Sequence, residues 1–396
     1  MPRSYPSHLD TLYPPSHKEV KVNCSFSSWS LGKDVCNTFT IMHRSSSLFK
    51  SLQRVHLRSS NANTRVREVN SSDEGAALTE VYRGENPEID IVAVHGINGD
   101  AFGTFSAKSN NRFWLGDHDM LPRDVNNSRI MTYRYPASVA TMLGGTSSDR
   151  ILQHAQTMIA ELVADRELED ATERPIIFVC HSLGGIIVKR ALVYSASRTG
   201  RHVNHLHSIY VSTYGILFFG TPHQGSGTAN LATFVQRIVE VFLPSKLVDT
   251  QAQLLDALKE GSEVLQEITD NFAPLMRDLR VYFFWEQEKT DLGYKLDYIV
   301  TETSAAPILD NTDRAGLRAD HRGMCRFPSR NAPGYKLVAS SLLRYSRDAP
   351  QAISRRWRVE KDILRSLRQQ ELRNLREEDE LELEDKSETK TSKMED

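Results

Sequence analysis

The chain has 396 residues, of which 39% are hydrophobic and 25% charged, and its formal net charge is −2. This composition can supply the core of one large domain or of two. The near-neutral charge balance lacks the basic footprint of nucleic-acid-binding proteins, so we expect no nucleic-acid partner. Four cysteines without paired spacing argue against a disulfide framework or a zinc site and suit a reducing compartment. No apolar run is long enough to cross a bilayer, which predicts a soluble or peripheral protein.

The N-terminal leader, residues 1–75, is rich in Ser, Asn, Arg and Pro and has no sustained periodicity, which predicts a disordered or weakly ordered segment. Between Val35 and Arg67 there are six Lys or Arg and no Asp or Glu. The stretch that begins at Met42 is basic, Ser-rich and acid-poor, as mitochondrial transit peptides are. A presequence normally starts the chain, so this hypothesis requires Met42 to be the real start. The alternative is a disordered basic leader on a cytoplasmic protein.

From about Glu88 to Val338, β-rich runs alternate with helical patterns, which predicts an α/β fold with a mostly parallel central sheet and helices on both faces. Apolar residues recur on one face of a helix predicted over Ile151–Val163. The predicted strands are Ile89–Val94, Ile130–Tyr133, Ile176–Cys180, Tyr214–Phe219, Val281–Trp285 and Leu296–Val300. We expect a leader at 1–75, an α/β domain at 76–350, and a charged helix with an acidic tail at 351–396.

The segment IIFVCHSLGGIIVK, which begins at Ile176, is typical of a nucleophile elbow. A β-branched strand ends in a tight turn that carries Ser182, and a helical pattern follows at once. Positions two before and two after such a serine must be small, and here they are Cys180 and Gly184. Cys180 departs from the usual Gly, but a thiol is small enough to fit. An ordinary Gly-Gly turn is the alternative interpretation.

A nucleophilic serine needs a histidine to accept its proton. In a parallel sheet the active site lies at the carboxyl ends of the strands, so residues between a helix and the next strand lie at the far edge. This places His202, His205 and His207 on the wrong side, and His223 comes too soon after the elbow. His321 follows the last predicted strand, where we expect the general base. A surface histidine is the alternative.

The acid that orients this histidine is less clearly marked. Glu286 closes the predicted strand Val281–Trp285 and reproduces the chain order serine, acid, histidine. Glu288, Glu302 and Asp291 are alternatives, because each could lie near the same edge of the sheet.

A glycine-rich loop, HGINGD from His95 to Asp100, follows the first predicted strand, where an oxyanion hole is usually built. We expect one donor to be the backbone N–H of Leu183, directly after the serine. The second donor would be the N–H of Ile97 or Asn98.

Together the segments VHGINGD, VCHSLGGIIVKRAL, GILFFGTPHQGSG and ADHRGMCRF resemble the lipase-like serine esterases of the α/β-hydrolase superfamily. They are similar in particular to the serine-active-site-containing protein group and to the N-terminal hydrolase modules of fungal NACHT receptors. The resemblance implies the α/β-hydrolase fold, Ser182 as nucleophile, His321 as base, and chemistry without a metal or organic cofactor. It also implies a lipid ester substrate and association with mitochondrial or endoplasmic reticulum membranes.

Two further segments bear on function. The insertion Gly225–Asp278, before the penultimate strand, is apolar from Leu231 to Leu243 and predicts either a lid or ordinary packing helices. The charged run from about Ser354 predicts a helix whose Ile363, Leu364 and Leu367 could dock on the α/β domain or on a partner helix. A solvated helix is the alternative. No G-x-x-x-x-G-K-[ST] string occurs, so we expect no P-loop.

The residues therefore predict a serine hydrolase that cleaves carboxylic esters, and the resemblance implies that the ester is a lipid. The alternative is a signalling or scaffold module that keeps the fold but has lost turnover.

Overall fold

The structure, a computed structural model, describes residues 77–137, 147–223, 234, 236–237 and 263–392. The predicted leader, the transit-like stretch from Met42 and most of the predicted lid insertion lie outside the described residues. Within the described part, the insertion contributes a helix over residues 263–272 and the 3-10 helix η3, Ala273–Asp278.

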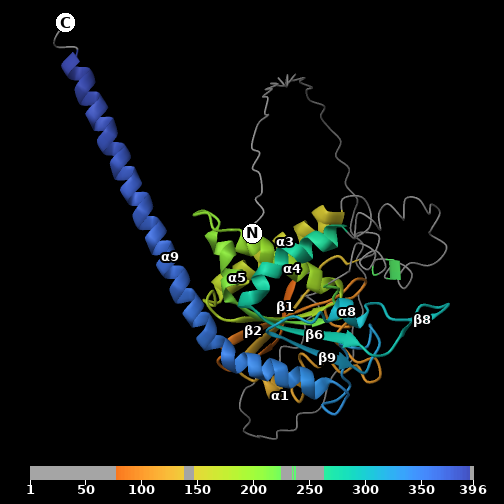
Figure 1. Ribbon diagram of the computed structural model, residues 1–396. Helices are drawn as coiled ribbons and strands as arrows, with labels where there is room; N and C mark the ends of the chain where they lie inside the picture. The colour runs from red at the N-terminus through yellow and green to blue at the C-terminus, as the bar shows by residue number, and fades with distance from the viewer. Residues whose placement is uncertain (1–76, 138–146, 224–233, 235, 238–262, 393–396) are drawn as a thin grey trace, which may run out of the picture. The chain divides into compact units, whose positions relative to one another are not determined.

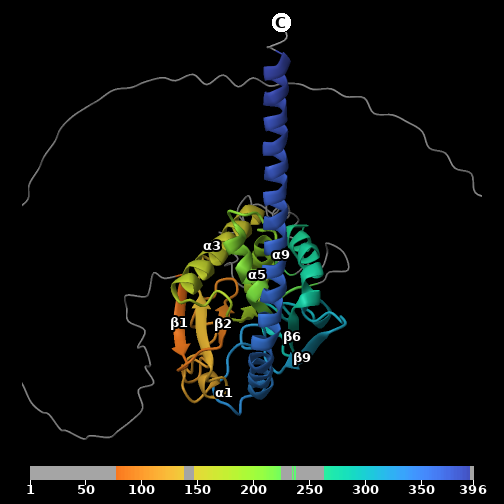
Figure 2. The same cartoon turned by 90° about the vertical axis from the view of Figure 1, so that its left-hand side faces the viewer.

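A seven-stranded sheet organises the described chain, with strand order β1-β3-β2-β4-β5-β6-β9. Strand β1 pairs with β3 in antiparallel fashion, and all the other neighbours are parallel. Figures 1 and 2 show helices on both sides of the sheet. The strands are β1 Leu78–Arg83, β2 Ile89–Val94, β3 Ser128–Tyr133, β4 Ile176–His181, β5 Thr213–Phe219, β6 Arg280–Glu286 and β9 Thr312–Leu317.

Each face of the sheet forms its own hydrophobic core. On one face lie α3 (Ser147–Leu168) and α4 (Leu183–Ala196), and on the other lie α1 (Leu121–Asp124) and α9 (Tyr335–Ser392). The short elements η2 (Asn204–His207) and α5 (Ser208–Ser212) lead into β5. Every residue of β2, β3, β4 and β5 is buried, because helices cover both of their faces. Such strands read as nearly continuous apolar runs, which is why the sequence predicts them well.

The prediction that Leu296–Val300 forms a strand of the main sheet is wrong. Only β8, Leu296–Asp297, is a strand, and it pairs with β7, Thr290–Asp291, in a separate two-stranded sheet. The last strand of the main sheet is β9, whose side chains are largely half-exposed at the sheet edge. The sequence of β9, TDRAGL, has no apolar run, so its hydrophobic pattern does not predict a strand. The opposite edge strand, β1, is also mostly half-exposed and is missed for the same reason.

The C-terminal helix begins well before the predicted Ser354. Helix α9 starts at Tyr335 and passes through the expected domain boundary near residue 350 without interruption. Beyond it, Arg356 donates to the carbonyl of Thr213 at 2.7 Å, and Trp357 Nε1 donates to Ser212 Oγ at 3.0 Å. The first turns of the predicted tail therefore pack on the α/β domain. The short α8, Glu302–Ala305, completes the described helices that Figure 1 labels.

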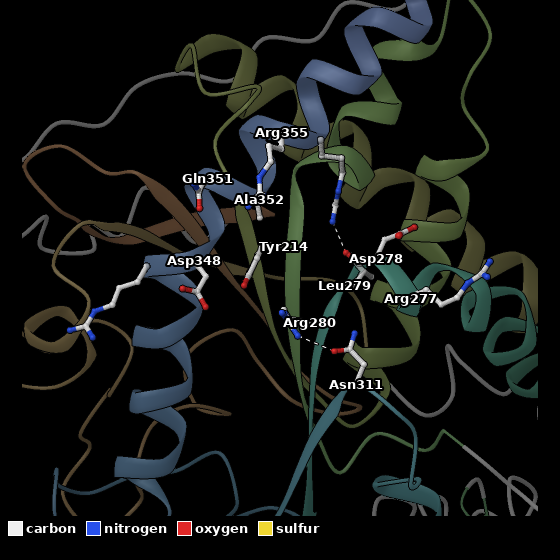
Figure 3. A pocket seen from close by; sticks show the side chains of 12 residues that line it. Tyr214, Arg277, Asp278, Leu279, Arg280, Asn311, Asp348, Gln351, Ala352 and Arg355 are labelled. Carbon is white, nitrogen blue, oxygen red and sulfur yellow. Dashed lines mark hydrogen bonds between the residues drawn. The ribbon is translucent and has the colours of Figure 1, made fainter.

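A hollow of about 450 Å³ lies where α9 meets the amino ends of β5 and β6 (Figure 3). Tyr214, Arg280 and Asp348 are among its lining residues, and Arg280 donates to Asn311 Oδ1 at 3.0 Å. The side chain of Arg277 points away from its centre in Figure 3. The hollow itself lies at the edge of the sheet opposite to the carboxyl ends of the parallel strands.

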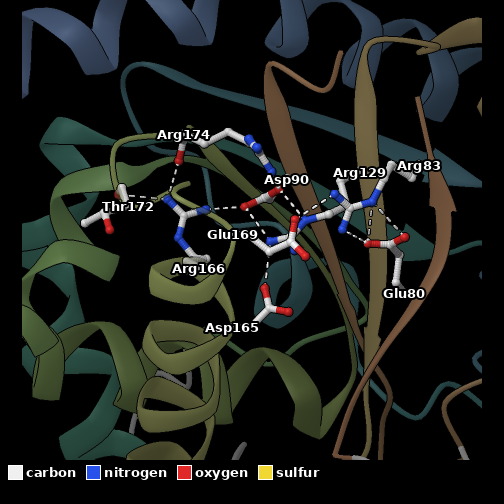
Figure 4. A network of polar contacts seen from close by, with 9 residues as sticks. All are labelled: Glu80, Arg83, Asp90, Arg129, Asp165, Arg166, Glu169, Thr172 and Arg174. Atoms are coloured by element: carbon white, nitrogen blue, oxygen red, sulfur yellow. Dashed lines mark hydrogen bonds and ion pairs between the residues drawn. The ribbon is translucent and has the colours of Figure 1, made fainter. Parts of the chain in front are cut away.

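A buried ion-pair network fixes the amino end of β2 (Figure 4). Asp90 is fully buried, and three arginines surround its carboxylate. Arg129 Nε lies 2.9 Å from Oδ1, Arg174 Nη1 lies 3.1 Å from the same oxygen, and Arg166 pairs with Oδ2. Arg166 also donates to the carbonyls of Thr172 and Arg174. The network joins β2, β3, α3 and the loop that leads into β4.

We expect Asp90→Asn to lower the free energy of unfolding by about 3–5 kcal/mol, because Arg166 would keep a buried charge without a carboxylate partner and Arg129 would keep only Asp165, 2.7 Å away. Urea unfolding followed by circular dichroism measures this loss. The control is Asp313→Asn, which removes an exposed partner of Arg344 and should cost about 0–1 kcal/mol. Equal losses in the two variants would contradict the assignment.

Candidate active site

Ser182 occupies a sharp turn between β4 and α4. Its backbone has φ 50° and ψ −122°, a conformation that non-glycine residues rarely adopt. A Cβ on Gly184 would lie 2.4 Å from the carbonyl oxygen of His95, and one on Gly185 would lie 2.2 Å from Thr221 Oγ1. Both positions therefore require glycine for α4 to pack this close. The buried Cys180 is accommodated where the usual pattern has Gly.

Three side chains that are far apart in the sequence meet at this turn. Ser182 Oγ lies 3.0 Å from His321 Nε2, and His321 Nδ1 lies 3.1 Å from Glu286 Oε2. Glu286 Oε1 accepts a hydrogen bond from the backbone N–H of Val300 at 2.8 Å. All three side chains are buried, with Ser182 1% and His321 2% exposed. The predicted serine, histidine and acid are thus adjacent, at the ends of β4, β9 and β6.

The alternative acids lie apart from His321. Glu302 pairs with Arg314 at 2.7 Å on the surface, and the side chain of Glu288 is 57% exposed. Asp291 accepts the backbone N–H of Gly293 at 2.8 Å. Among the carboxylates considered, Glu286 is the one in contact with the histidine.

The other histidines considered in the sequence lie elsewhere. His202, His205 and His207 lie between α4 and β5, in and before η2. His223 is buried between the rings of Phe218 and Phe283, with centroids 4.5 and 4.4 Å from its own. None of the four contacts Ser182 in the described structure.

The glycine-rich loop packs directly on the serine turn. A Cβ on Gly96 would lie 2.9 Å from Ser182 Cβ. The N–H of Asn98 donates to the carbonyl of Ala137 at 2.7 Å, so this donor is already engaged. The N–H of Ile97 has no backbone acceptor among the described residues, and Leu183 is the first residue of α4. Of the two alternatives in this loop, Ile97 is therefore the better placed to donate.

Sequence analysis does not identify several residues that hold the candidate active site in place. Tyr135 stacks on the ring of His95 at 4.4 Å and donates its hydroxyl to the carbonyl of His95 at 2.8 Å, which holds the glycine-rich loop. Thr221 Oγ1 donates to the carbonyl of Ser182 at 2.9 Å. His181 Nε2 donates to the carbonyl of His321 at 2.8 Å. Tyr135 and Thr221 each follow a strand at the catalytic edge, and this position is the signal that could have revealed them.

His181 is uncharged in the folded protein. Burial, with a smaller contribution from neighbouring His321, lowers the pKa of its imidazole to about 3. The unfolded chain, in which this pKa returns toward 6.5, therefore binds one proton more than the folded chain between pH 6.5 and 3. Folding stability from this group is fully present above pH 6.5 and falls as the pH is lowered through this range.

We expect His181→Gln, which keeps an N–H donor but does not titrate, to reduce the acid sensitivity of folding. From pH 7 to pH 5 the wild type should lose about 2 kcal/mol more unfolding free energy than the variant. Urea titrations at both pH values measure the difference. The exposed His118 supplies the control, since His118→Gln should leave the wild-type loss unchanged. If His181→Gln loses as much as wild type, His181 is charged in the folded state.

These features together define the α/β-hydrolase fold. The sheet is mostly parallel, a serine sits on the strand–turn–helix elbow, and the serine, acid and histidine follow in this chain order. The fold expected from the sequence is therefore confirmed. Among the described residues, no group of three or more His, Cys, Asp or Glu is arranged to hold a metal ion. In the same part of the chain, no helix is long and apolar enough to span a bilayer.

The chain is similar in sequence to Protein SERAC1 of several vertebrates. It is 25% identical to the Bos taurus protein over 286 residues, which cover 68% of this chain and 40% of that protein. It is 28% identical to the Danio rerio protein over 268 residues, which cover 62% and 37%. The chain thus spans about two fifths of the length of these curated relatives. No protein-family model matches the chain.

Solved structures similar to the chain include hydrolases. The lipase BlEst2 of Bacillus licheniformis is 19% identical, with a TM-score of 0.42, and the alignment covers 67% of this chain and 97% of the lipase. A carboxylesterase structure from Nitrososphaera gargenis is 13% identical, with a TM-score of 0.38, and the alignment covers 68% and 95%. The resemblance to the hydrolase modules of NACHT receptors stays a prediction.

Proposed function

We propose that the protein is a serine hydrolase that cleaves carboxylic esters through an acyl-enzyme on Ser182. The observation that carries this proposal is the 3.0 Å contact between Ser182 Oγ and His321 Nε2 at the tip of a strained turn. A serine hydroxyl becomes a good nucleophile when an adjacent imidazole accepts its proton. The buried Glu286 carboxylate on the far side of the ring completes the arrangement.

In the proposed reaction, Ser182 Oγ attacks the ester carbonyl while its proton passes to His321 Nε2. The Glu286 carboxylate stabilises the resulting imidazolium through Nδ1. The backbone N–H groups of Leu183 and Ile97 donate to the developing oxyanion. When the tetrahedral intermediate collapses, His321 returns the proton to the departing alkoxide. A water molecule then attacks the acyl-enzyme, again with His321 as base, and releases the acid and the free serine.

We expect a fluorophosphonate probe to label the wild type but not the Ser182→Ala and His321→Ala variants, because the probe reacts only with an activated serine. In-gel fluorescence of the purified full chain measures the labelling rate. Ser340→Ala, a change at an exposed serine of α9, is the matched control and should label like wild type. The Glu286→Gln variant should label about 10⁴-fold more slowly, by analogy with the acid-to-amide change in serine proteases.

A variant of the neighbouring loop is the control for the assignment of Glu286 as the acid. Glu288→Gln removes an exposed carboxylate two residues away and should leave the labelling rate within about twofold of wild type. Slower labelling of Glu288→Gln than of Glu286→Gln would remove Glu286 from the mechanism. A wild type that folds but does not label would favour the alternative function, a hydrolase-like signalling or scaffold module without turnover.

The finer part of the proposal is that the ester is a lipid. Its support is the resemblance of the sequence motifs to lipase-like esterases and the apolar stretch Leu231–Leu243. Most of that stretch lies outside the described residues, and its one described apolar residue, Phe234, is buried. Peripheral contact with mitochondrial or endoplasmic reticulum membranes and a protein partner on α9 belong to the same proposal. The exposed Ile363 and Leu367 of α9 are available to such a partner.

If the substrate is a lipid, kcat/KM should rise at least tenfold from acetyl to octanoyl esters of one alcohol, because each buried CH₂ contributes about 0.8 kcal/mol. Spectrophotometric assays with p-nitrophenyl esters of increasing acyl length measure the profile. The Ser182→Ala protein provides the background hydrolysis rate. A flat or falling profile would contradict a lipid substrate while leaving the ester hydrolase proposal intact.

A further inference from the structure

A second cavity, of about 360 Å³, lies on the α4 side of the sheet. It is enclosed by α4, the helix over 263–272, η3 and the segments that follow β5 and α8. None of its lining residues belongs to the serine, histidine and acid of the candidate active site. Its volume is within the usual range for sites that bind small molecules. Its lining includes Lys189, His223, Thr269, Phe272, Met276 and Phe283.

Lys189 brings a buried amino group to this cavity. Its side chain is fully buried in α4, and Nζ donates to the carbonyl of Pro222 at 3.1 Å and to Thr269 Oγ1 at 3.2 Å. An ammonium group has three hydrogens to donate, so one remains. Burial lowers the pKa of this group to about 7, and only Asp270 counteracts the shift. No carboxylate of the described residues forms an ion pair with Lys189.

A buried ammonium group without a counter-ion is rare, because removing a charge from water is costly. Most fully buried lysines are paired with a carboxylate or are neutral. A ligand that brought its own negative charge to Lys189 would supply the missing partner.

His223 presents a second polar atom at the same cavity. Its ring is 4% exposed and packs edge-on against Phe218 and Phe283. Nε2 has no hydrogen-bond partner among the described residues. Burial lowers the pKa of this imidazole well below its ordinary value, so the ring is neutral and one of its nitrogens carries a hydrogen. A ligand oxygen that accepted this hydrogen would satisfy a buried polar group that the protein leaves unpaired.

Polar and apolar side chains share the rest of the lining. The polar ones are Gln266, Thr269 and Asp270, and Asp270 accepts a hydrogen bond from Gln266 Nε2 at 2.8 Å. Phe272 and Phe283 contribute aromatic surface, and Met276, Pro307 and Leu309 contribute aliphatic surface. Lys189 is the cationic residue of this lining and Asp270 its carboxylate, and no ion pair joins the two. The aromatic and aliphatic surface beside Lys189 therefore suits a singly charged ligand with a hydrocarbon part. Inorganic phosphate has no apolar part and carries more charge than one lysine can balance.

We propose that this cavity binds a small carboxylic acid with an apolar tail. One carboxylate oxygen accepts the third hydrogen of Lys189 Nζ, and the other accepts the hydrogen of His223 Nε2. The tail packs against Phe272, Met276 and Phe283. This proposal does not depend on the hydrolase activity of Ser182, because the two sites share no residue.

The test is isothermal titration of the full chain with hexanoate at pH 7, with 1-hexanol and inorganic phosphate as comparison ligands. We expect hexanoate to bind at least tenfold more tightly than either comparison ligand. Ser182→Ala should bind hexanoate as the wild type does, because Ser182 does not line this cavity. Lys189→Met should weaken hexanoate binding at least tenfold, because it removes the charge and keeps the side-chain length.

Two further variants keep the test decisive if Lys189→Met fails to fold. His223→Phe preserves the aromatic packing and removes the ring nitrogens, so it should weaken hexanoate binding at least fivefold. Lys295→Met removes a lysine from the surface and should bind like wild type. The proposal is overturned if the wild type does not bind hexanoate, if 1-hexanol or phosphate binds as tightly, or if binding is lost in Ser182→Ala. It is also overturned if the folded Lys189 and His223 variants bind hexanoate normally.

Discussion

The strained turn at Ser182 is the constraint on which the candidate active site depends. A non-glycine residue at φ 50° and ψ −122° costs on the order of 1–3 kcal/mol and persists only where its surroundings enforce it. Here the N–H of Ser182 donates to the carbonyl of Phe219, and its own carbonyl accepts from Thr221. The close approach of α4 at Gly184 leaves no room for a relaxed turn. The serine therefore stands at the carboxyl edge of the sheet, where the loops after β6 and β9 can reach it.

The two ends of the parallel strands carry different polar groups. At the amino end of β2, Asp90 holds Arg129, Arg166 and Arg174 in a buried cluster that ties three elements and a loop together. At the carboxyl end, Glu286 and His321 follow the neighbouring strands β6 and β9 and meet beside Ser182 to form the candidate active site. The ionic cluster stabilises the framework without competing for space with the site.

The sequence reveals the parts of this structure whose causes are local. Buried parallel strands must be apolar on both faces, and an elbow must have small residues around its serine, so both leave patterns that can be read directly. Edge strand β9 and the choice among Glu286, Glu288 and Glu302 are decided by contacts between distant segments. The three glutamates have the same chemistry, and only packing shows that Glu286 faces His321 while Glu302 pairs with Arg314. The same holds for Asn98, whose N–H is taken by Ala137, and for the pairing of Lys189 with Pro222.

Burial explains why the position of Glu286 matters more than its charge. The exposed pair of Glu302 and Arg314 is screened by water, so its attraction is worth little. Glu286 is buried and has two neighbours, the N–H of Val300 and the imidazole of His321. In the proposed reaction, its carboxylate gains a positively charged partner when His321 takes the proton of Ser182. An interaction that strengthens along the reaction lowers the barrier, whereas one already complete in the resting enzyme does not. By this argument a salt bridge to a permanently charged arginine at position 321 could hold Glu286 equally well and contribute nothing to the reaction.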